Sequence, residues 1–283
     1  MSPASANPRS LDTYFQKHIT RLEATLERFL PKPSQHLAQI HEAMRYAVLD
    51  GGKRIRPLLC LAVSDMLGGD EDEALIPACA VELIHSYSLI HDDLPCLDND
   101  EFRRGKLTCH KKFGEAIALL AGDGLLTLAF QTISKLKDSE KAHRILTEMS
   151  QAAGTFGMVG GQVMDIQSEK QEIDLPTLDA IHILKTGQLI KTSCLAGAVI
   201  AGAGKEIESH ILRFGEYLGF AFQIVDDILD GDGYLRFMSS HEAREKTAEV
   251  IAKAKDELKG FKDNSYLAQL ADFILNREVE KKR

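Results

Sequence analysis

Hydrophobic residues recur at helical spacing along almost the whole chain. A first stripe stops at Pro31 and Pro33, which block a helix, and it consists of Leu11, Phe15, Ile19, Leu22, Leu26 and Phe29. A second stripe over 37–48 ends at a Gly-Gly pair, and a third over 55–67 has Pro57 in its first turn. The same spacing predicts helices over 74–94, 115–136, 142–152, 156–167, 178–200, 206–229, 241–258 and 267–279.

Strand signals are nearly absent from the chain. No run alternates between apolar and polar residues, and no Asn-Gly pair marks a hairpin. The helix breakers are short, which is typical of neighbouring antiparallel helices. No shift in composition marks a boundary, so we predict an all-α fold in which residues 1–283 form a single domain of about ten helices.

Composition narrows the classes of function. The chain has 283 residues, 44% of them hydrophobic, and a net charge of −8 without a long basic run, so it can bury a large core and we expect no nucleic-acid partner. Its five cysteines form no Cys-x-x-Cys pair, which argues against a disulfide framework or a zinc site and favours the reducing cytoplasm.

We expect no membrane span. The apolar stretch 194–204 is too short, and Asp123 interrupts the run 116–130. The first ten residues contain no apolar segment of a signal peptide, although the acid-free stretch Met1–Arg9 is compatible with the remnant of a transit peptide.

Two aspartate clusters are the strongest chemical signal. Each follows an apolar run that predicts the end of a buried helix, and the clusters are Asp92-Asp93-Leu94-Pro95-Cys96-Leu97-Asp98 and Asp226-Asp227-Ile228-Leu229-Asp230. Carboxylates in such places are costly unless a cation meets them. Ligand sets made only of oxygen suit Mg²⁺, which in proteins usually also holds substrate phosphates. The first hypothesis is therefore a site that binds a diphosphate through metal ions.

The spacing within each cluster supports this hypothesis. Asp226 and Asp230 are four residues apart, which is about 400° of helical rotation, so their carboxylates share one face. An ideal helix would separate Asp92 from Asp98 by about 120°, but Pro95 lies between them and we expect a local bulge to return Asp98 to the side of Asp92. A solvated acidic helix end is the alternative, and the presence of two such pairs favours metal binding.

Basic residues accompany the clusters. Lys53, Arg54 and Arg56 lie at the start of a predicted helix, where backbone N–H groups already favour anions. Arg103 and Arg104 follow the first cluster, and arginine suits bidentate phosphate binding. His85 lies seven residues before Asp92, two turns away on roughly the same face. Each residue alone reads better as a surface charge or a satisfied core histidine, but together they indicate a phosphate site.

These motifs, in this order, resemble the trans-isoprenyl diphosphate synthases and among them the bacterial-type farnesyl diphosphate synthases. The match runs from about Gly51 to Asp230, and more weakly through 273–277. Its segments are Gly51-Gly52-Lys53-Arg54-Ile55-Arg56-Pro57, the first acidic cluster, Arg103-Arg104-Gly105, Gly161-Gln162-Val163-Met164-Asp165, Lys185-Thr186-Gly187 and Phe222 to Asp230. The resemblance implies helices around a deep central cavity and head-to-tail condensation of dimethylallyl or geranyl diphosphate with isopentenyl diphosphate.

The resemblance also implies a role for individual residues. Asp92, Asp98 and Asp226 would ligate Mg²⁺, up to three ions with Mn²⁺ as an alternative, and Asp93, Asp227 and Asp230 would belong to the same catalytic set. Four residues would bind isopentenyl diphosphate, namely Lys53, Arg56, His85 and Arg104. Four others would face the allylic diphosphate, namely Arg103, Lys185, Thr186 and Gln223. A homodimer is implied as well.

The chain departs from the family pattern after the second cluster. The family usually places a loop there that contains lysine and glycine and closes over the allylic diphosphate, whereas Gly231-Asp232-Gly233 here runs straight into Tyr234. Either the protein lacks this lid or the sequence omits a mobile segment, and we favour the second explanation. Leu107 also replaces the proline that usually follows the Arg-Arg-Gly motif.

Product length is expected to follow from the depth of the cavity. Ser88 lies one helical turn below Asp92, about 5.4 Å deeper, and Tyr87 lies one turn below His91. Tyr87 resembles the aromatic floor of farnesyl-type enzymes, with ordinary core packing as the alternative. Rival hypotheses are a geranylgeranyl or geranyl diphosphate synthase, a class I terpene cyclase, a non-catalytic partner subunit and a helical scaffold.

Overall fold

The computed structural model describes residues 11–49, 51–169 and 171–277. The transit-peptide hypothesis for Met1–Arg9 and the predicted helix end at Val279 lie outside these residues. The elements in chain order are α1 (Leu11–Phe29), α2 (Ala38–Leu49), α3 (Ile55–Met66), α4 (Glu71–Asp92), β1 (Phe102–Arg103), β2 (Lys106–Leu107), α5 (Cys109–Phe113), α6 (Glu115–Ile133), α7 (Ser139–Ala153), α8 (Met158–Ser168), α9 (Leu175–His182), the π-helical turn η1 (Ile183–Gly187), α10 (Gln188–Ile200), α11 (Lys205–Asp230), the 3₁₀ turn η2 (Gly233–Arg236), α12 (Ser240–Glu257) and α13 (Ser265–Leu275).

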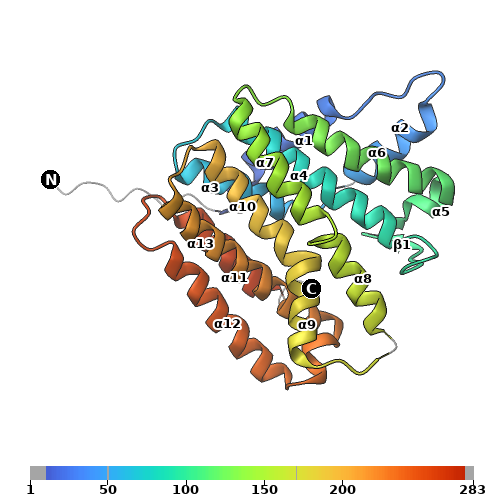
Figure 1. The fold of residues 1–283 in the computed structure, drawn as a ribbon. Coiled ribbons are helices and arrows are strands. Elements are labelled where there is room, and N and C mark those ends of the chain that lie inside the picture. The colour runs from blue at the N-terminus through green and yellow to red at the C-terminus, as the bar shows by residue number, and fades with distance from the viewer. Residues whose placement is uncertain (1–10, 50, 170, 278–283) are drawn as a thin grey trace.

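The all-α prediction is confirmed. Helix α4 runs through the middle of the bundle, packed against α3 and α6, while α10 packs between α3 and α11 (Figure 1). Early and late helices are in contact, for example α1 with α13. The largest cluster of buried apolar side chains surrounds α4 and α6, and a second joins α3 to α11, α12 and α13.

Local signals explain where α4 begins and ends. The Asp70 side chain accepts a hydrogen bond from the Glu73 N–H at 2.9 Å, which caps the first turn. The helix is apolar nearly all round, as a central helix must be, and it ends at Asp92 three residues before Pro95. Because the acidic motif begins at this end, the central helix delivers its carboxylates to the end of the bundle where the cavities lie.

Two local features differ from the prediction. The segment 178–200, predicted as one helix, is interrupted by the π-helical turn η1, where Gly161 of α8 packs so closely that an added Cβ would lie 2.3 Å from the Lys185 backbone N. A small antiparallel hairpin, β1–β2, also lies between the first acidic motif and α5. Its two turn residues are Arg104 (φ 53°) and Gly105 (φ 77°), which suit a type I′ turn without the usual Asn-Gly pair.

In the part of the chain that the structure describes, two helices, α4 and α6, are long and apolar enough to cross a membrane by length and composition alone. The share of the most apolar window that is buried inside the protein is 72% in α4 but only 39% in α6. Core packing therefore accounts for α4, whereas α6 leaves Leu119 and Leu120 about half exposed.

Candidate active site

Three adjoining cavities occupy the end of the bundle where both acidic motifs lie. One of about 440 Å³ is lined by the second motif, one of about 350 Å³ contains Asp92 and a largely apolar wall from α8, and one of about 480 Å³ is rich in lysine and arginine. The buried Thr186 of η1 lines all three. The fold therefore joins an acidic, an apolar and a basic compartment around one point.

The first acidic motif adopts the bulge that Pro95 predicts. The Asp98 N–H donates to the Asp92 carbonyl at 2.9 Å, so the intervening residues loop out and the chain returns to the helix end. Burial raises the pKa of Asp92 to about 6, with Lys185 opposing the shift and Asp98 adding to it. The pKa of Asp98 is raised as well, by burial first. Both carboxylates therefore lie where a cation would relieve an electrostatic cost.

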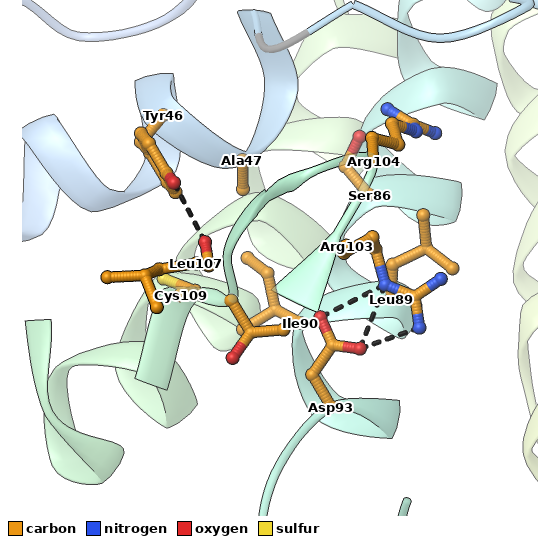
Figure 2. Close-up of a pocket in the computed structure, with 11 residues that line it drawn as sticks. Tyr46, Ala47, Ser86, Leu89, Ile90, Asp93, Arg103, Arg104, Leu107 and Cys109 are labelled. Carbon is orange, nitrogen blue, oxygen red and sulfur yellow. Dashed lines mark hydrogen bonds and ion pairs between the residues drawn. The ribbon is translucent and has the colours of Figure 1, made fainter. Parts of the chain in front are cut away.

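Asp93 has a different partner. Its carboxylate is 3% exposed and accepts three hydrogen bonds from Arg103, at 2.8 and 3.1 Å from Nε and 2.6 Å from Nη2 (Figure 2). Burial lowers the pKa of Arg103, but the hydrogen bond and charge of Asp93 outweigh that effect and raise it. Asp93 thus holds the guanidinium of Arg103, a residue of β1, at the rim of the site.

In the second motif, too, the two adjacent aspartates have different partners. Asp226 lies between the acidic and basic cavities and forms an ion pair with Arg277 at 2.8 Å. Asp227 accepts the Tyr234 N–H at 2.9 Å and lies 3.6 Å from the His182 ring. Burial raises the pKa of Asp227 to about 7, with the Tyr234 N–H opposing the shift, and lowers that of His182 to about 4. Asp230 is exposed at the end of α11, lining the acidic cavity.

The donor set fits magnesium bound together with a phosphate ligand. Among the described residues, no three His, Cys, Asp or Glu side chains converge closely enough to chelate an ion by themselves. Mg²⁺ does not require that, because it keeps several waters and is commonly held by one or two carboxylates plus substrate phosphates. Asp92 lines the apolar cavity, Asp226 lines the acidic and basic ones, and the backbone bulge holds Asp98 next to Asp92. Burial raises the pKa of all three carboxyl groups, which would offer a cation oxygen ligands only.

The basic cavity brings together the four residues predicted to bind isopentenyl diphosphate, which are Lys53, Arg56, His85 and Arg104. The Arg56 Nε is buried without a hydrogen-bond partner, as expected of a group that awaits an anion. Burial and then the neighbouring arginines lower the pKa of His85 well below its usual value, so this ring is neutral at pH 7 and can donate one hydrogen bond.

Arg54 differs from the other basic residues near the start of α3. Its backbone is left-handed (φ 51°), and its fully buried guanidinium donates to Glu82 at 2.5 Å and to the Val48 carbonyl at 2.6 Å. Arg54 also lines the basic cavity, but its guanidinium is already paired with Glu82, so a part for it in neutralising substrate phosphate stays a prediction. Its ion pair fixes the loop that presents Lys53 and Arg56.

The residues predicted to face the allylic diphosphate come from three elements. Lys185 and Thr186 lie on η1, whose wider turn brings both to the cavities, and Lys185 donates to Asp165 of α8 at 2.6 Å. Gln223 of α11 lines both the acidic and the basic cavities. Together with Arg103 these residues surround the space between the two acidic motifs.

The predicted chain-length residues line the apolar cavity. Tyr87 is 5% exposed there, and its ring meets that of His91 edge-on with 5.7 Å between centroids. Ser88 lies beside it and donates to the His85 carbonyl at 3.0 Å. Opposite them, α8 contributes Met158, Val159, Val163 and Ile166.

Three residues at the site were not singled out from the sequence. Arg277, beyond the end of α13, reaches Asp226 and stacks over Phe222 at 4.2 Å, with its Nε and Nη1 buried and unpaired. His182 and Tyr234 adjoin Asp227, and the Tyr234 hydroxyl donates to Asp179. Arg277 ends the segment 273–277, whose weak match to the family gave this residue no role, and no local motif marks His182 or Tyr234. The packing of distant helices brings the three residues together.

A comparison with protein families finds that residues 37–238 match the model of polyprenyl synthetase. A dimethylallyltranstransferase of Fischerella ambigua (strain UTEX 1903) is 40% identical over 292 residues, covering 95% of this chain and 84% of the relative. The chloroplastic large subunit 1 of a heterodimeric geranylgeranyl pyrophosphate synthase of Arabidopsis thaliana is 40% identical over 304 residues, covering 96% and 81%. Both alignments are longer than the 283 residues of this chain, so both relatives contain residues that this chain lacks.

Solved structures agree with the sequence relatives. An FPP/GFPP synthase of Zymomonas mobilis superposes with a TM-score of 0.90 at 37% identity, covering 94% of this chain and 98% of that one. A geranyltransferase of Legionella pneumophila gives a TM-score of 0.86 at 35% identity, covering 96% of each chain. Family match, sequence identity and fold agree over nearly the full described length, and the chain is therefore a prenyltransferase of the polyprenyl synthetase family.

Proposed function

We propose that the protein is a Mg²⁺-dependent farnesyl diphosphate synthase, which condenses dimethylallyl and then geranyl diphosphate with isopentenyl diphosphate. One observation supports this proposal above the others, namely the meeting of an acidic, a basic and an apolar compartment at Thr186. The reaction needs a metal-bound leaving group, a second diphosphate and a tail pocket in adjacent places, and each compartment suits one of them.

The side chains have complementary tasks in this proposal. Mg²⁺ bound with the allylic diphosphate would neutralise the negative charge that grows on the leaving group. Arg103, fixed by Asp93 in the basic cavity, and Lys185 of the acidic cavity would donate hydrogen bonds to the same leaving group, which favours the transition state over the ground state. Lys53, Arg56 and the neutral His85 would hold isopentenyl diphosphate so that its double bond faces the allylic carbon. The apolar wall of α8 would exclude water from the carbocation.

A farnesyl product is the finer part of the proposal. The buried Tyr87, which lines the tail cavity next to His91, would stop the growing chain. The second candidate is a geranylgeranyl diphosphate synthase, because most of the curated relatives carry that name. Incubation with Mg²⁺, isopentenyl diphosphate and either allylic substrate, followed by chromatography of the dephosphorylated products, separates the two. A predominantly C20 alcohol would contradict the farnesyl assignment.

A non-catalytic partner subunit is the alternative from another class. The chain lacks the lysine-containing lid that the family usually places after the second acidic motif, and two relatives are named as large subunits of heterodimeric synthases. Against this alternative, both acidic motifs are complete here, and a subunit without catalysis would not need them. Turnover by the purified chain alone would support the enzyme, and turnover only after addition of a second subunit would support the alternative.

A homodimer formed through α6 belongs to the same proposal. This helix is apolar but largely uncovered, with Leu119 47% and Leu120 51% exposed, and Leu107 of the adjoining hairpin is exposed as well. An apolar helix face of this kind is costly in water unless another surface covers it, and a second copy supplies a self-complementary one. Light scattering should give twice the mass of 31.3 kDa, and Leu120→Glu should shift the protein to the monomer. A monomeric wild type at micromolar concentration would refute the dimer.

The five free cysteines suit a reducing compartment such as the cytoplasm. Four of them, Cys60, Cys79, Cys109 and Cys194, are buried, and burial raises the pKa of their thiols. Buried thiols with raised pKa react slowly, so they act as small apolar side chains in the core.

A further inference from the structure

The ring of His91 forms part of the wall of the tail cavity, one turn above Tyr87 on α4. It lines that cavity beside Tyr87 and Ser88 and lies directly before the acidic motif. The residue lies at the junction between the metal-binding end of α4 and the space for the prenyl tail. The position of this ring therefore affects the width of the cavity near its mouth.

Helix α6, which carries no residue of the acidic motifs, holds the ring in place. The His91 Nε2 lies 3.0 Å from the Leu119 carbonyl oxygen and 4.0 Å from Asp123 Oδ1. A carbonyl oxygen only accepts hydrogen bonds, so the His91 Nε2 carries the proton, and its N–H donates a hydrogen bond to the Leu119 carbonyl. The ring is thus anchored to the backbone of a neighbouring helix.

Gly122 provides the space for this anchoring. A Cβ built on Gly122 would lie 2.1 Å from Nε2, 2.5 Å from Cδ2 and 3.0 Å from Cε1 of His91. The residue is buried inside α6 and its φ is not positive, so the backbone conformation does not require glycine. Glycine within a helix costs about 1 kcal/mol relative to alanine. The benefit that offsets this cost is the close approach of the imidazole.

We infer that Gly122 is a positioning residue for product length, acting through His91 on a cavity that it does not line. This inference rests on the proposed prenyl-chain elongation. A methyl group at position 122 displaces the ring from the Leu119 carbonyl toward Tyr87 and the tail space. The narrowed cavity then favours the shorter product, so α6 determines chain length together with positions 87 and 88 of α4.

The test compares Gly122→Ala with Gly124→Ala, a matched change two residues further along α6. A Cβ at Gly124 would lie 3.2 Å from the Met44 sulfur, a flexible group away from the cavity. One methyl group in a pocket changes discrimination by about 10-fold or more. We therefore expect the C10-to-C15 product ratio of Gly122→Ala to rise about tenfold, while Gly124→Ala retains the wild-type ratio. His91→Ala combined with Gly122→Ala should restore the longer products, because the clashing ring is gone.

A second readout is independent of catalysis. In proteins with nitrogen-labelled histidine, the hydrogen-bonded Nε2–H of His91 should give a slowly exchanging ring signal in the wild type and in Gly124→Ala, and this signal should be lost in Gly122→Ala. The inference is overturned if Gly122→Ala keeps the signal, if it keeps the wild-type product ratio, or if His91→Ala fails to reverse its effect. A wild type that shows the ring signal but condenses no substrate would instead refute the proposed function.

Discussion

The contact between Asp93 and Arg103 provides the sharpest test of the site. Substituting Asp93 by asparagine removes the nearer and more buried counter-charge of Arg103 and weakens a set of three hydrogen bonds, while the size of the side chain is retained. Breaking a buried pair from one side costs about 3–5 kcal/mol. The Arg103 side chain is 33% exposed, so water recovers part of that cost and we expect about 1–3 kcal/mol.

The kinetic effect should be specific to one substrate. If Asp93 serves to orient Arg103 toward the allylic diphosphate, kcat/KM for geranyl diphosphate should fall by about 10–100-fold, the equivalent of about 1.4–2.8 kcal/mol. The KM for isopentenyl diphosphate should change much less. Asp100→Asn is the matched control, because the Asp100 carboxylate also faces Arg103, at 3.7 Å, but its side chain is 53% exposed. Exposed ion pairs of this kind contribute about 0–1 kcal/mol to stability.

A double-mutant cycle shows whether the two residues act together. We expect Asp93→Asn to have little further effect in an Arg103→Ala background, giving a coupling free energy of at least about 1 kcal/mol in kcat/KM. Effects that add to within about 0.5 kcal/mol would refute the reasoning, since independent residues behave in that way. If the Mg²⁺ concentration needed for half-maximal activity rose instead, Asp93 would be a metal ligand.

Three further predictions concern the motifs directly. Asp92→Ala should reduce turnover by orders of magnitude while circular dichroism still shows a folded protein, and near-normal turnover in excess Mg²⁺ would contradict the metal assignment. Tyr87→Ala should lengthen the products, whereas Tyr87→Phe should not, and chromatography showing C15 from both would exclude Tyr87 as the floor. In metal-free buffer, folding raises the pKa of Asp227 to about 7, mainly through burial, so the folded state disfavours the ionised carboxylate. The contribution of Asp227 to the free energy of unfolding therefore falls as the pH rises from about 4 through 7. Asp227→Asn should therefore gain stability relative to the wild type between pH 5 and pH 8 in urea unfolding, and a pH-independent difference would refute the assigned cause.

Periodicity alone located the long helices of the bundle, but not the shorter elements. The β1–β2 hairpin has no turn sequence that predicts it, and its position depends on contacts between distant residues. The Tyr46 hydroxyl donates to the Leu107 carbonyl at 2.7 Å (Figure 2). The Thr108 hydroxyl donates to the Asp100 carbonyl, also at 2.7 Å. The π-helical turn likewise depends on the close approach of Gly161, which helical spacing cannot reveal.

Sequence motifs identified the candidate site, but not how its charges are paired. Spacing predicted the bulge at Pro95 and the shared face of Asp226 and Asp230. All of Lys53, Arg54 and Arg56 line the basic cavity, but spacing could not show that the Arg54 guanidinium is fully buried and paired with Glu82. That pairing depends on a residue of α4 distant in the sequence, which the pattern at the start of α3 does not reveal.

A division between charges that line a cavity and charges that hold another segment of the protein also explains why each acidic motif begins with two adjacent aspartates. Neighbouring residues on a helix are rotated by about 100°, so the two carboxylates of a pair point in different directions even where both line one cavity, as Asp226 and Asp227 do. The first of each pair, Asp92 or Asp226, lines a cavity next to basic groups, where the proposed metal-bound diphosphate would lie. The second holds the segment that follows: Asp93 binds Arg103 of the hairpin, and Asp227 binds the Tyr234 N–H of η2. Substitutions at the first position should therefore alter the response to Mg²⁺, and those at the second the placement of the next segment, so that stability and Mg²⁺ titrations separate the two classes.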